Sequence, residues 1–163
     1  MRVRAGEPSD ASFITTMAQL ASVIEDDPLP AVDDPALLLG LPPAPDTAVV
    51  ALDREGHRIG AAWWHIRERS LVVTPDGAPV PEIVVAVVPA ARGRGVGRRL
   101  LDALATRAAE SGHDRLALNV HIRNPAVHLY SRAGFVVAGR AGGRSASRWS
   151  GSCGRKAPCR CPR

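Results

Sequence analysis

Apolar residues recur at helical spacing in two long stretches of the chain. Residues 10–24 carry one such stripe behind Ser9 and Asp10, residue types that favour helix N-caps. Residues 96–111 carry a second stripe, and Gly112 follows in the position typical of a helix stop. Both stretches are therefore predicted to be amphipathic helices. Their stripes comprise Phe13, Met17, Leu20, Ala21 and Ile24 in the first stretch, and Val96, Leu100, Leu101, Leu104 and Ala108 in the second.

Shorter runs of apolar and β-branched residues predict strands between and around these helices. Residues 82–88 are apolar on both faces, which is typical of a central strand. A short helix is predicted to open at Asn124-Pro125 and to end at Gly134. This order predicts a mixed α/β domain around a single sheet. The predicted strands are Val3–Arg4, Thr47–Leu52, Ile59–Arg67, Glu82–Val88, Arg115–His121 and one that starts at Phe135.

The length of 163 residues and the apolar content of 45% predict one globular domain with a substantial core. No run approaches the roughly 18 apolar residues of a transmembrane helix. Met1 and Arg2 are soon followed by polar residues, so the pattern of a secretory signal is missing. We therefore expect a cytoplasmic protein that does not enter a membrane. The excess of arginine over lysine is typical of a GC-rich bacterial genome.

The net charge of +5 is unevenly distributed. Residues 140–163 hold seven basic and no acidic residues, a charge of +7, which leaves −2 for residues 1–139. Nucleic-acid binding is therefore not indicated for the body of the chain. The three cysteines, Cys153, Cys159 and Cys161, also lie in this tail. They lack the paired C-x2–4-C spacing of a zinc site, so no metal is expected.

The segment 82–97 joins the apolar strand to the second helix through a loop rich in arginine and glycine. Backbone amides at a helix N-terminus favour an anion, so this loop indicates a phosphate-bearing ligand. The dinucleotide motif G-x-G-x-x-G fails because Arg98 holds the third glycine position, and the P-loop fails because no Gly-Lys-Ser/Thr follows. The remaining pattern is Arg-x-x-Gly-x-Gly, from Arg92, Gly95 and Gly97. A glycine-rich turn without a ligand is the alternative.

This pattern resembles the pyrophosphate-binding loop of the GNAT superfamily of N-acetyltransferases. A second segment, Asn124-Pro-Ala-x-x-Leu129-Tyr130-Ser-x-x-Gly134-Phe135, resembles the last helix of that family and the turn into its sixth strand. With the strand and helix cap near the start of the chain, the resemblance covers residues 1–139. It implies the GNAT-like acyl-CoA N-acyltransferase fold, a single mixed, mostly antiparallel sheet with helices on both faces.

The resemblance implies that acetyl-CoA is the co-substrate. It assigns the cofactor to backbone groups of the central strand, to the loop, and to Asn124, whose capping of its helix would alone explain that residue. The oxyanion donor would be the amide of Val87 or Val88. Arg98 and Arg99 could add charge near the phosphates, with a solvated helix face as the alternative. The cofactor-binding candidates are Val85, Ala86, Val87, Arg92, Gly93, Arg94, Gly95, Val96, Gly97, Arg98 and Asn124.

Two side chains are the candidates for proton transfer. Tyr130 lies at the motif position of the family's general acid, and a phenol, whose ordinary pKa is about 10, can protonate a departing thiolate. Glu82 is the candidate base, directly or through water. The alternatives are aromatic packing for Tyr130 and a solvated strand end for Glu82. His65 and His121 are further candidates for the base, whereas Asn119, at the position of the base in some relatives, cannot accept a proton.

The acceptor is expected beside the acidic, proline-rich loop at 25–46, the turn at 53–58 and the pair Trp63-Trp64. Neighbours on a strand point to opposite sides, so at most one of these rings can line the cleft. The acidic loop favours a cationic amine. We therefore expect a small-molecule or peptide amine as acceptor, with no membrane or nucleic-acid partner, and leave a homodimer open.

The tail departs from the family pattern. Residues 140–163 offer no apolar seventh strand, so that strand is predicted to be absent or altered, and this basic Arg/Gly/Ser/Cys tail to be disordered. A shift of reading frame shortly after Phe135 would explain it, because GC-rich codons for residues 144–153, read two bases later, can encode an apolar strand. The predicted function is acetyl transfer to a primary amine. The alternatives are a non-catalytic acyl-CoA-binding module, or binding of nucleic acid or another acidic partner through the tail.

Overall fold

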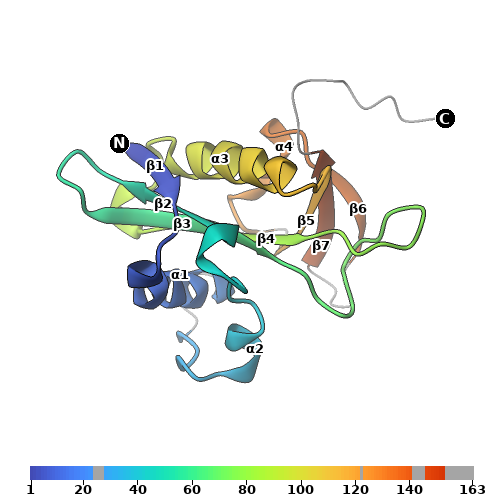
Figure 1. Ribbon diagram of the computed structural model, residues 1–163, viewed down its shortest axis with the longest axis horizontal. Coiled ribbons are helices and arrows are strands. Elements are labelled where there is room, and N and C mark those ends of the chain that lie inside the picture. Colours follow the sequence, from blue (N-terminus) through green and yellow to red (C-terminus); the bar gives the residue numbers. More distant parts are fainter. Residues whose placement is uncertain (24–27, 122, 141–145, 153–163) are drawn as a thin grey trace.

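Seven strands form one sheet in the part of the chain that the computed structural model describes, residues 1–23, 28–121, 123–140 and 146–152 (Figure 1). The strand order is β1-β2-β3-β4-β5-β7-β6, and neighbours are antiparallel except for β4 and β5. The predicted mixed, mostly antiparallel sheet is thus confirmed. The strands are β1 Arg2–Ala5, β2 Ala48–Leu52, β3 Arg58–His65, β4 Glu82–Val87, β5 Arg115–His121, β6 Val136–Arg140 and β7 Ala146–Ser152.

Helices cover both faces of the sheet, with α3 and α4 on one side and α1 and α2 on the other (Figure 1). The two long helices begin and end within two residues of the ranges that their apolar stripes predict. None of the described helices combines the length and the apolar character needed to cross a membrane. The helices are α1 Ala11–Ser22, α2 Pro35–Leu38, α3 Val96–Glu110 and α4 Val127–Arg132.

Each face of the sheet has its own hydrophobic core because side chains alternate along the strands. Under α3, Trp64 of β3 belongs to a cluster with Leu100, and under α1, Trp63 belongs to a cluster with Met17. All four side chains are buried, and burying a large apolar side chain contributes about 1.5–3 kcal/mol. The two successive tryptophans therefore fasten opposite layers to one strand.

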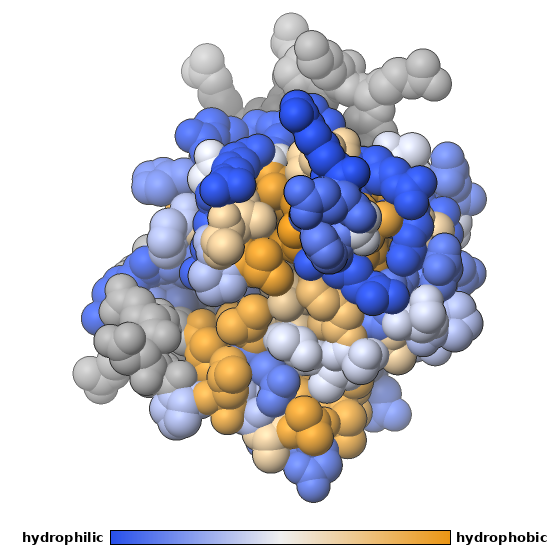
Figure 2. All heavy atoms as spheres, turned by 90° about the vertical axis from the view of Figure 1, so that its left-hand side faces the viewer, coloured by the Kyte–Doolittle hydropathy of each residue, from blue (hydrophilic) through white to orange (hydrophobic). Residues whose placement is uncertain are grey.

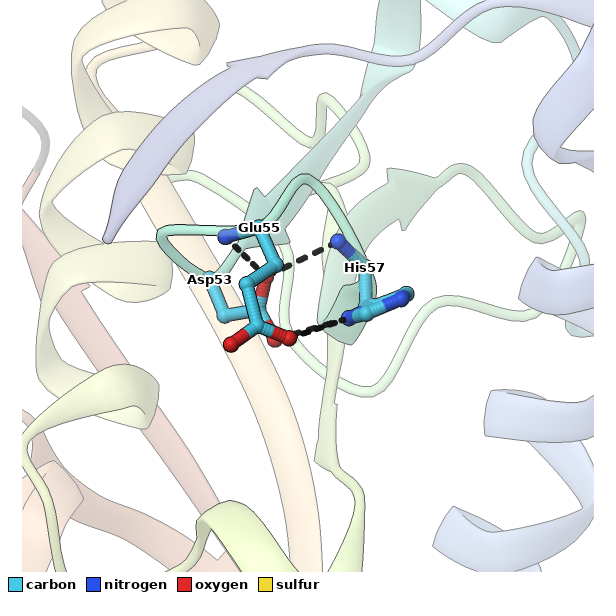
Figure 3. A group of neighbouring side chains, drawn as sticks. All are labelled: Asp53, Glu55 and His57. Atoms are coloured by element: carbon cyan, nitrogen blue, oxygen red, sulfur yellow. Dashed lines mark hydrogen bonds and ion pairs between the residues drawn. The ribbon is translucent and has the colours of Figure 1, made fainter.

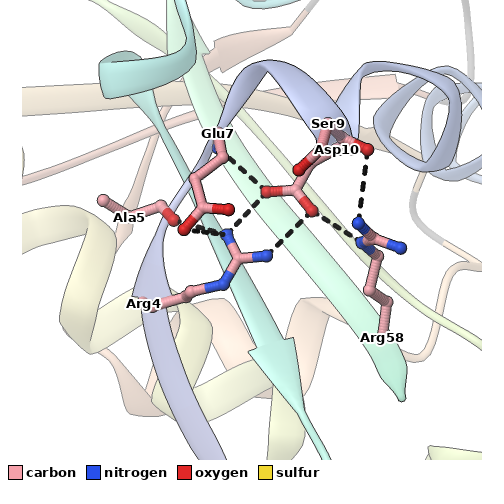
Figure 4. Close-up of polar contacts among 6 residues, drawn as sticks. All are labelled: Arg4, Ala5, Glu7, Ser9, Asp10 and Arg58. Atoms are coloured by element: carbon pink, nitrogen blue, oxygen red, sulfur yellow. Dashed lines mark hydrogen bonds and ion pairs between the residues drawn. The ribbon is translucent and has the colours of Figure 1, made fainter. Parts of the chain in front are cut away.

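A buried carboxylate ties α1 to β1 and β3 (Figure 4). Asp10 is fully buried, and its oxygens accept hydrogen bonds from Arg4 at 2.6 and 3.0 Å, from Arg58 at 2.6 Å and from the amide of Glu7 at 2.9 Å. Burial alone would raise the pKa of this carboxyl, but the hydrogen bonds from Arg4 and Arg58 outweigh it and lower the pKa to about 2. Asp10 precedes α1 as predicted, yet its side chain joins strands and makes no capping hydrogen bond to the helix.

β4 and β5 separate soon after they meet. In the described part of the chain, their parallel pairing is limited to Glu82 opposite Ala117, where the Ala117 amide donates to the Pro81 carbonyl at 2.8 Å. On its other side, β4 stays paired with β3 as far as Val87 opposite Gly60. The edge of β4 that faces β5 is therefore open toward the C-terminal end of the strand.

The seventh strand was predicted to be absent or altered; its absence is wrong, and a strand of altered, serine-rich composition is present. β7 lies between β5 and β6 and pairs antiparallel with both, along the whole length of β5. Strand pairing uses backbone groups, and two flanking strands satisfy both edges of β7, so a segment rich in serine forms a strand despite its low β propensity. Residues 141–145 and 153–163 lie outside the described residues, so the expected disorder and frame shift of the tail stay predictions.

Candidate active site

The loop between β4 and α3 presents backbone amides at a helix N-terminus. Gly93 and Gly95 have φ angles of +73° and +77°, a left-handed conformation that glycine adopts without strain. The first hydrogen bond of α3 runs from the Arg99 amide to the Gly95 carbonyl at 3.2 Å. The three amides before Arg99 therefore have no acceptor within the helix. This arrangement suits an anion, as predicted for the loop.

The motif glycines have two different roles. Apart from the glycine and its two chain neighbours, no heavy atom of the described residues lies within 4 Å of the place where a Cβ would stand on Gly93 or Gly95. A Cβ on Gly97, in contrast, would come within 3.2 Å of Leu129 Cδ2 on α4. Gly93 and Gly95 thus shape an open loop, whereas Gly97 allows α3 to pack closely on α4.

Two of the predicted arginines make specific contacts. Arg92 donates from Nε to the Val87 carbonyl at 3.2 Å, at the end of β4. Arg98 donates from Nε to Asp102 at 2.9 Å and from a terminal nitrogen to the Arg132 carbonyl at 3.1 Å. Arg92 therefore stays at the strand edge, while the contacts of Arg98 favour the alternative of a helix-surface role.

A cleft of about 700 Å³ opens beside the loop. Its lining includes Arg94 and Arg99 together with Arg54 of the β2–β3 turn. Figure 2 views this end of the molecule, where hydrophilic side chains crowd the upper part of the face above a hydrophobic area. Three guanidinium groups at one opening favour an anionic ligand, although Asp53 and Glu55 line the same cleft.

The β2–β3 turn brings Asp53, Glu55 and His57 together (Figure 3). Asp53 Oδ1 accepts the amides of Glu55 and His57, each at 2.9 Å, and Oδ2 lies 3.3 Å from His57 Nδ1. Burial alone would raise the pKa of Asp53, but these donors outweigh it and lower the pKa. The ligand atoms lie within 4.8 Å of one another, a spacing that admits a cation, yet the hydrogen bonds already explain the cluster as a stabilised turn.

The ladder between β3 and β4 decides which amides of β4 face the open edge. The Val88 amide donates to the Ile59 carbonyl at 3.1 Å. Backbone groups alternate in direction along an antiparallel strand, so Ala86 also pairs toward β3, whereas Val85 and Val87 direct their amides and carbonyls toward β5. Of the two oxyanion donors that the resemblance implied, Val87 faces the open edge and Val88 does not.

Tyr130 lies in α4 and joins the core under α3. It is 7% exposed and meets Phe135 edge to face, with ring centroids 5.9 Å apart. Burial raises the pKa of its phenol to about 12. Before this helix, the side-chain carbonyl of Asn124 accepts the amide of Ala126 at 2.9 Å and braces the turn. The contact of Asn124 with a cofactor stays a prediction.

Glu82 is buried at the start of β4, with 5% of its surface exposed, so the alternative of a solvated strand end is wrong. Its Oε1 accepts the Leu71 amide at 2.9 Å, and its Oε2 lies 3.4 Å from Arg67 Nε and 3.8 Å from His65 Nε2. Arg67 Nε donates to His65 Nε2 at 3.0 Å. Burial, and then the charge of Arg67, lowers the pKa of His65 to about 4, so this imidazole is neutral at neutral pH.

Arg67 is the site residue that the sequence interpretation missed. Alternation along residues 59–67 places His65 and Arg67 on one face of the strand, which is the signal available in the sequence. Their proximity to Glu82 depends on the register that sets His65 opposite Glu82. The periodicity within one strand does not predict its pairing register with the next strand.

Both tryptophans of β3 are buried, so neither ring lines an open cleft. Trp63 Nε1 donates to the Gly40 carbonyl at 2.7 Å and anchors the proline-rich segment to the α1 face of the sheet. Trp64 meets His113 edge to face on the opposite side, with ring centroids 6.2 Å apart. The predicted opposite orientation of the two rings is confirmed.

The chain is similar in sequence to known acetyltransferases. Residues 17–135 match the Acetyltransferase (GNAT) family. The chain is 38% identical over 95 residues to a mycothiol acetyltransferase of Propionibacterium freudenreichii, and 36% identical over 88 residues to one of Cellulomonas flavigena. These stretches cover 57% and 51% of this chain but 28% and 25% of the relatives. The chain thus spans about a quarter of the length of the curated relatives it matches.

Solved structures share the fold. The yncA protein of Salmonella typhimurium, solved with its cofactor acetyl-CoA, has a TM-score of 0.67 at 23% identity, covering 96% of each chain. A GCN5-related N-acetyltransferase from Kribbella flavida has a TM-score of 0.66 at 26% identity, covering 93% of this chain and 96% of that one. These similarities confirm the fold that the resemblance implied. Because the family match spans most of its length, the chain belongs to the GNAT family of acetyltransferases.

Proposed function

We propose that this chain transfers an acetyl group from acetyl-CoA to a primary amine. The observation that carries the proposal is the continuity between the open edge of β4 and the amide-lined loop at the N-terminus of α3. An extended acyl carrier needs hydrogen-bond partners along its amide-bearing arm and an anion site for its pyrophosphate. The chain offers the two end to end, and the open space around Gly93 and Gly95 leaves room for the phosphates.

Backbone groups of Val85 and Val87 would bind the arm of acetyl-CoA. Ala86 lies between them but pairs toward β3. The loop amides at 93–97 would bind the pyrophosphate, and Arg92 and Arg94 would supply positive charge beside it. Arg98 and Asn124 stay candidates from the family motif.

Acetyl-CoA supplies an acyl group activated as a thioester. In the reaction a C–N bond forms between the amine and the carbonyl carbon while the C–S bond breaks. The Val87 amide would stabilise the negative charge that develops on the carbonyl oxygen. Tyr130, whose pKa is about 12, is protonated at neutral pH and would give its proton to the departing thiolate. Glu82 would accept the proton that the nitrogen loses, and its burial favours a route through water over direct contact.

The names of the relatives support a small-molecule acceptor, and we propose the non-acetylated amine form of mycothiol as the first to test. The segment anchored by Trp63 at Gly40 lies on the same face of the sheet as Glu82. Between these two features we place the acceptor amine. A non-catalytic acyl-CoA-binding module was the alternative linked to a missing seventh strand, and the presence of β7 removes that reason.

Two measurements test the proposal in sequence. Thermal unfolding with acetyl-CoA, compared with acetyl-pantetheine that lacks the pyrophosphate, tests cofactor binding; we expect stabilisation by the first compound far above that by the second. Mass spectrometry then detects acetylated products from the amine form of mycothiol, spermidine, glucosamine and a peptide with a free N-terminus. Stabilisation without any acetylated product would leave a binding module, and no stabilisation would refute both functions.

A further inference from the structure

The proposed acetyl transfer uses one residue of a polar cluster at the N-terminal end of β4, and the other residues of the cluster point to a further role. The cluster consists of Glu82, His65 opposite it on β3, Arg67 just beyond β3, and the amide of Leu71. We propose that Arg67, held by His65, is a positioning residue that fixes the orientation of the Glu82 carboxylate. This inference rests on the proposed function.

The geometry brings positive charge to a buried carboxylate without burying the whole guanidinium. The Glu82 side chain is 6% exposed, whereas that of Arg67 is 48% exposed. Arg67 turns its Nε inward, 3.0 Å from His65 Nε2 and 3.4 Å from Glu82 Oε2. Solvent still hydrates the rest of the guanidinium, so the desolvation cost of the pair falls mainly on Glu82.

His65 acts here as an acceptor for Arg67. Because Nε2 of the neutral imidazole accepts a hydrogen bond, its proton is on Nδ1. That Nδ1 is buried and has no hydrogen-bond partner among the described residues. An unpaired buried donor is costly and calls for an explanation. We infer that this ring orientation is kept because it holds Arg67 against Glu82. The unpaired Nδ1 is its consequence.

Other charged groups of the packed elements lie farther along the sheet. α1 and α2 contain no ionisable side chain. On the face of β5 that Ala117 shares with Glu82, the ionisable residues are Arg115 and His121, at the two ends of the strand. Among the described residues, His65 and Arg67 are the basic groups that lie within 4.0 Å of the Glu82 carboxylate.

The test compares Arg67→Gln with Arg69→Gln, which removes the same charge from an exposed position in the same loop. Initial rates are measured with acetyl-CoA and the amine form of mycothiol, or with the panel amine that the wild type acetylates. For Arg67→Gln we expect kcat to fall at least ten-fold and KM for acetyl-CoA to change less than two-fold. Arg67→Lys restores the charge and should recover part of kcat, and Arg69→Gln should match the wild type.

Each outcome separates positioning from a purely structural role. An Arg67→Gln enzyme with wild-type kcat would overturn the inference while leaving acetyl transfer intact. If Arg67→Gln does not fold, as judged by loss of thermal stabilisation by acetyl-CoA, Arg67→Lys carries the test, and a kcat at the wild-type level in that variant overturns the inference. A wild type that acetylates none of the amines refutes the proposed function itself, and this inference with it.

Discussion

Replacing Asp10 by asparagine should destabilise the fold by about 2 kcal/mol at neutral pH. The pKa of this carboxyl is about 2, against an ordinary value of 3.8. Each pH unit between these values corresponds to about 1.4 kcal/mol of folding free energy, which sets an upper value of about 2.5 kcal/mol for the charged form. Arg4 and Arg58 remain partly in contact with solvent, and its screening brings the expected figure down to about 2 kcal/mol.

The pH dependence follows from the lowered pKa. Because the pKa is lower in the folded state, the stabilisation is fully present above the ordinary value and is lost as the pH falls through 3.8 toward about 2. At about pH 3 roughly half of the difference between wild type and Asp10→Asn should remain. Urea unfolding of both proteins at pH 7 and near pH 3 measures it.

Asp114→Asn is the matched control, because Asp114 is exposed and the same charge is removed. We expect its effect to stay within about 0.5 kcal/mol. An Asp10→Asn cost below about 0.5 kcal/mol at pH 7, or an undiminished difference near pH 3, would refute the role given to the network of Asp10 with the two arginines.

Three further predictions concern the site. Tyr130→Phe keeps the ring that packs on Phe135 and removes the phenol proton. The steady-state acetylation rate should therefore fall about 100-fold or more, while the free energy of unfolding in urea changes by less than about 1 kcal/mol. A loss of rate under about three-fold would leave Tyr130 a packing residue. Gly95→Ala puts a Cβ at a φ of +77°, so calorimetry should show acetyl-CoA binding weakened by roughly ten-fold. Gly77→Ala, at a φ of +86° in another loop, carries similar strain and should bind normally. His65 has a pKa of about 4 against an ordinary value of 6.5, so its contribution to folding stability is complete above about pH 6.5 and is lost as the pH falls toward 4. In urea unfolding, the free energy of unfolding of His65→Gln should depend less steeply on pH in that window than that of the wild type. An identical slope in the two proteins would contradict this.

The layers of the fold were predictable because helix and strand periods report burial directly. The stripe that begins at Val96 became α3 on the sheet, ending at Glu110, one residue before the predicted Ser111. β7 was not predictable in this way. Its strand conformation comes from the position between β5 and β6, a tertiary property that the serine-rich composition of residues 146–152 does not reveal.

The candidate site divides along the same line. The left-handed turns at Gly93 and Gly95 depend on the residue type at those positions alone, so the glycine motif predicts them. The environment of Glu82 is assembled from a cross-strand neighbour and from a loop that returns with the Leu71 amide. An interpretation that treats Glu82 as a solvated strand end is reasonable for an isolated strand, and it fails because folding covers that end.

The divergence of β4 from β5 divides the sheet into two halves that are joined through a single pair of residues. Strands β1 to β4 form one half, and β5, β7 and β6 form the other. An extended ligand in the opening would act as a strand shared by both halves of the sheet. Hydrogen exchange of the Val85 and Val87 amides would then slow when acetyl-CoA binds, whereas exchange of the Ala86 amide, which is already paired toward β3, would change little. The substrate itself would then complete the sheet, and the hydrogen bonds between the two halves would form and break once in every catalytic cycle.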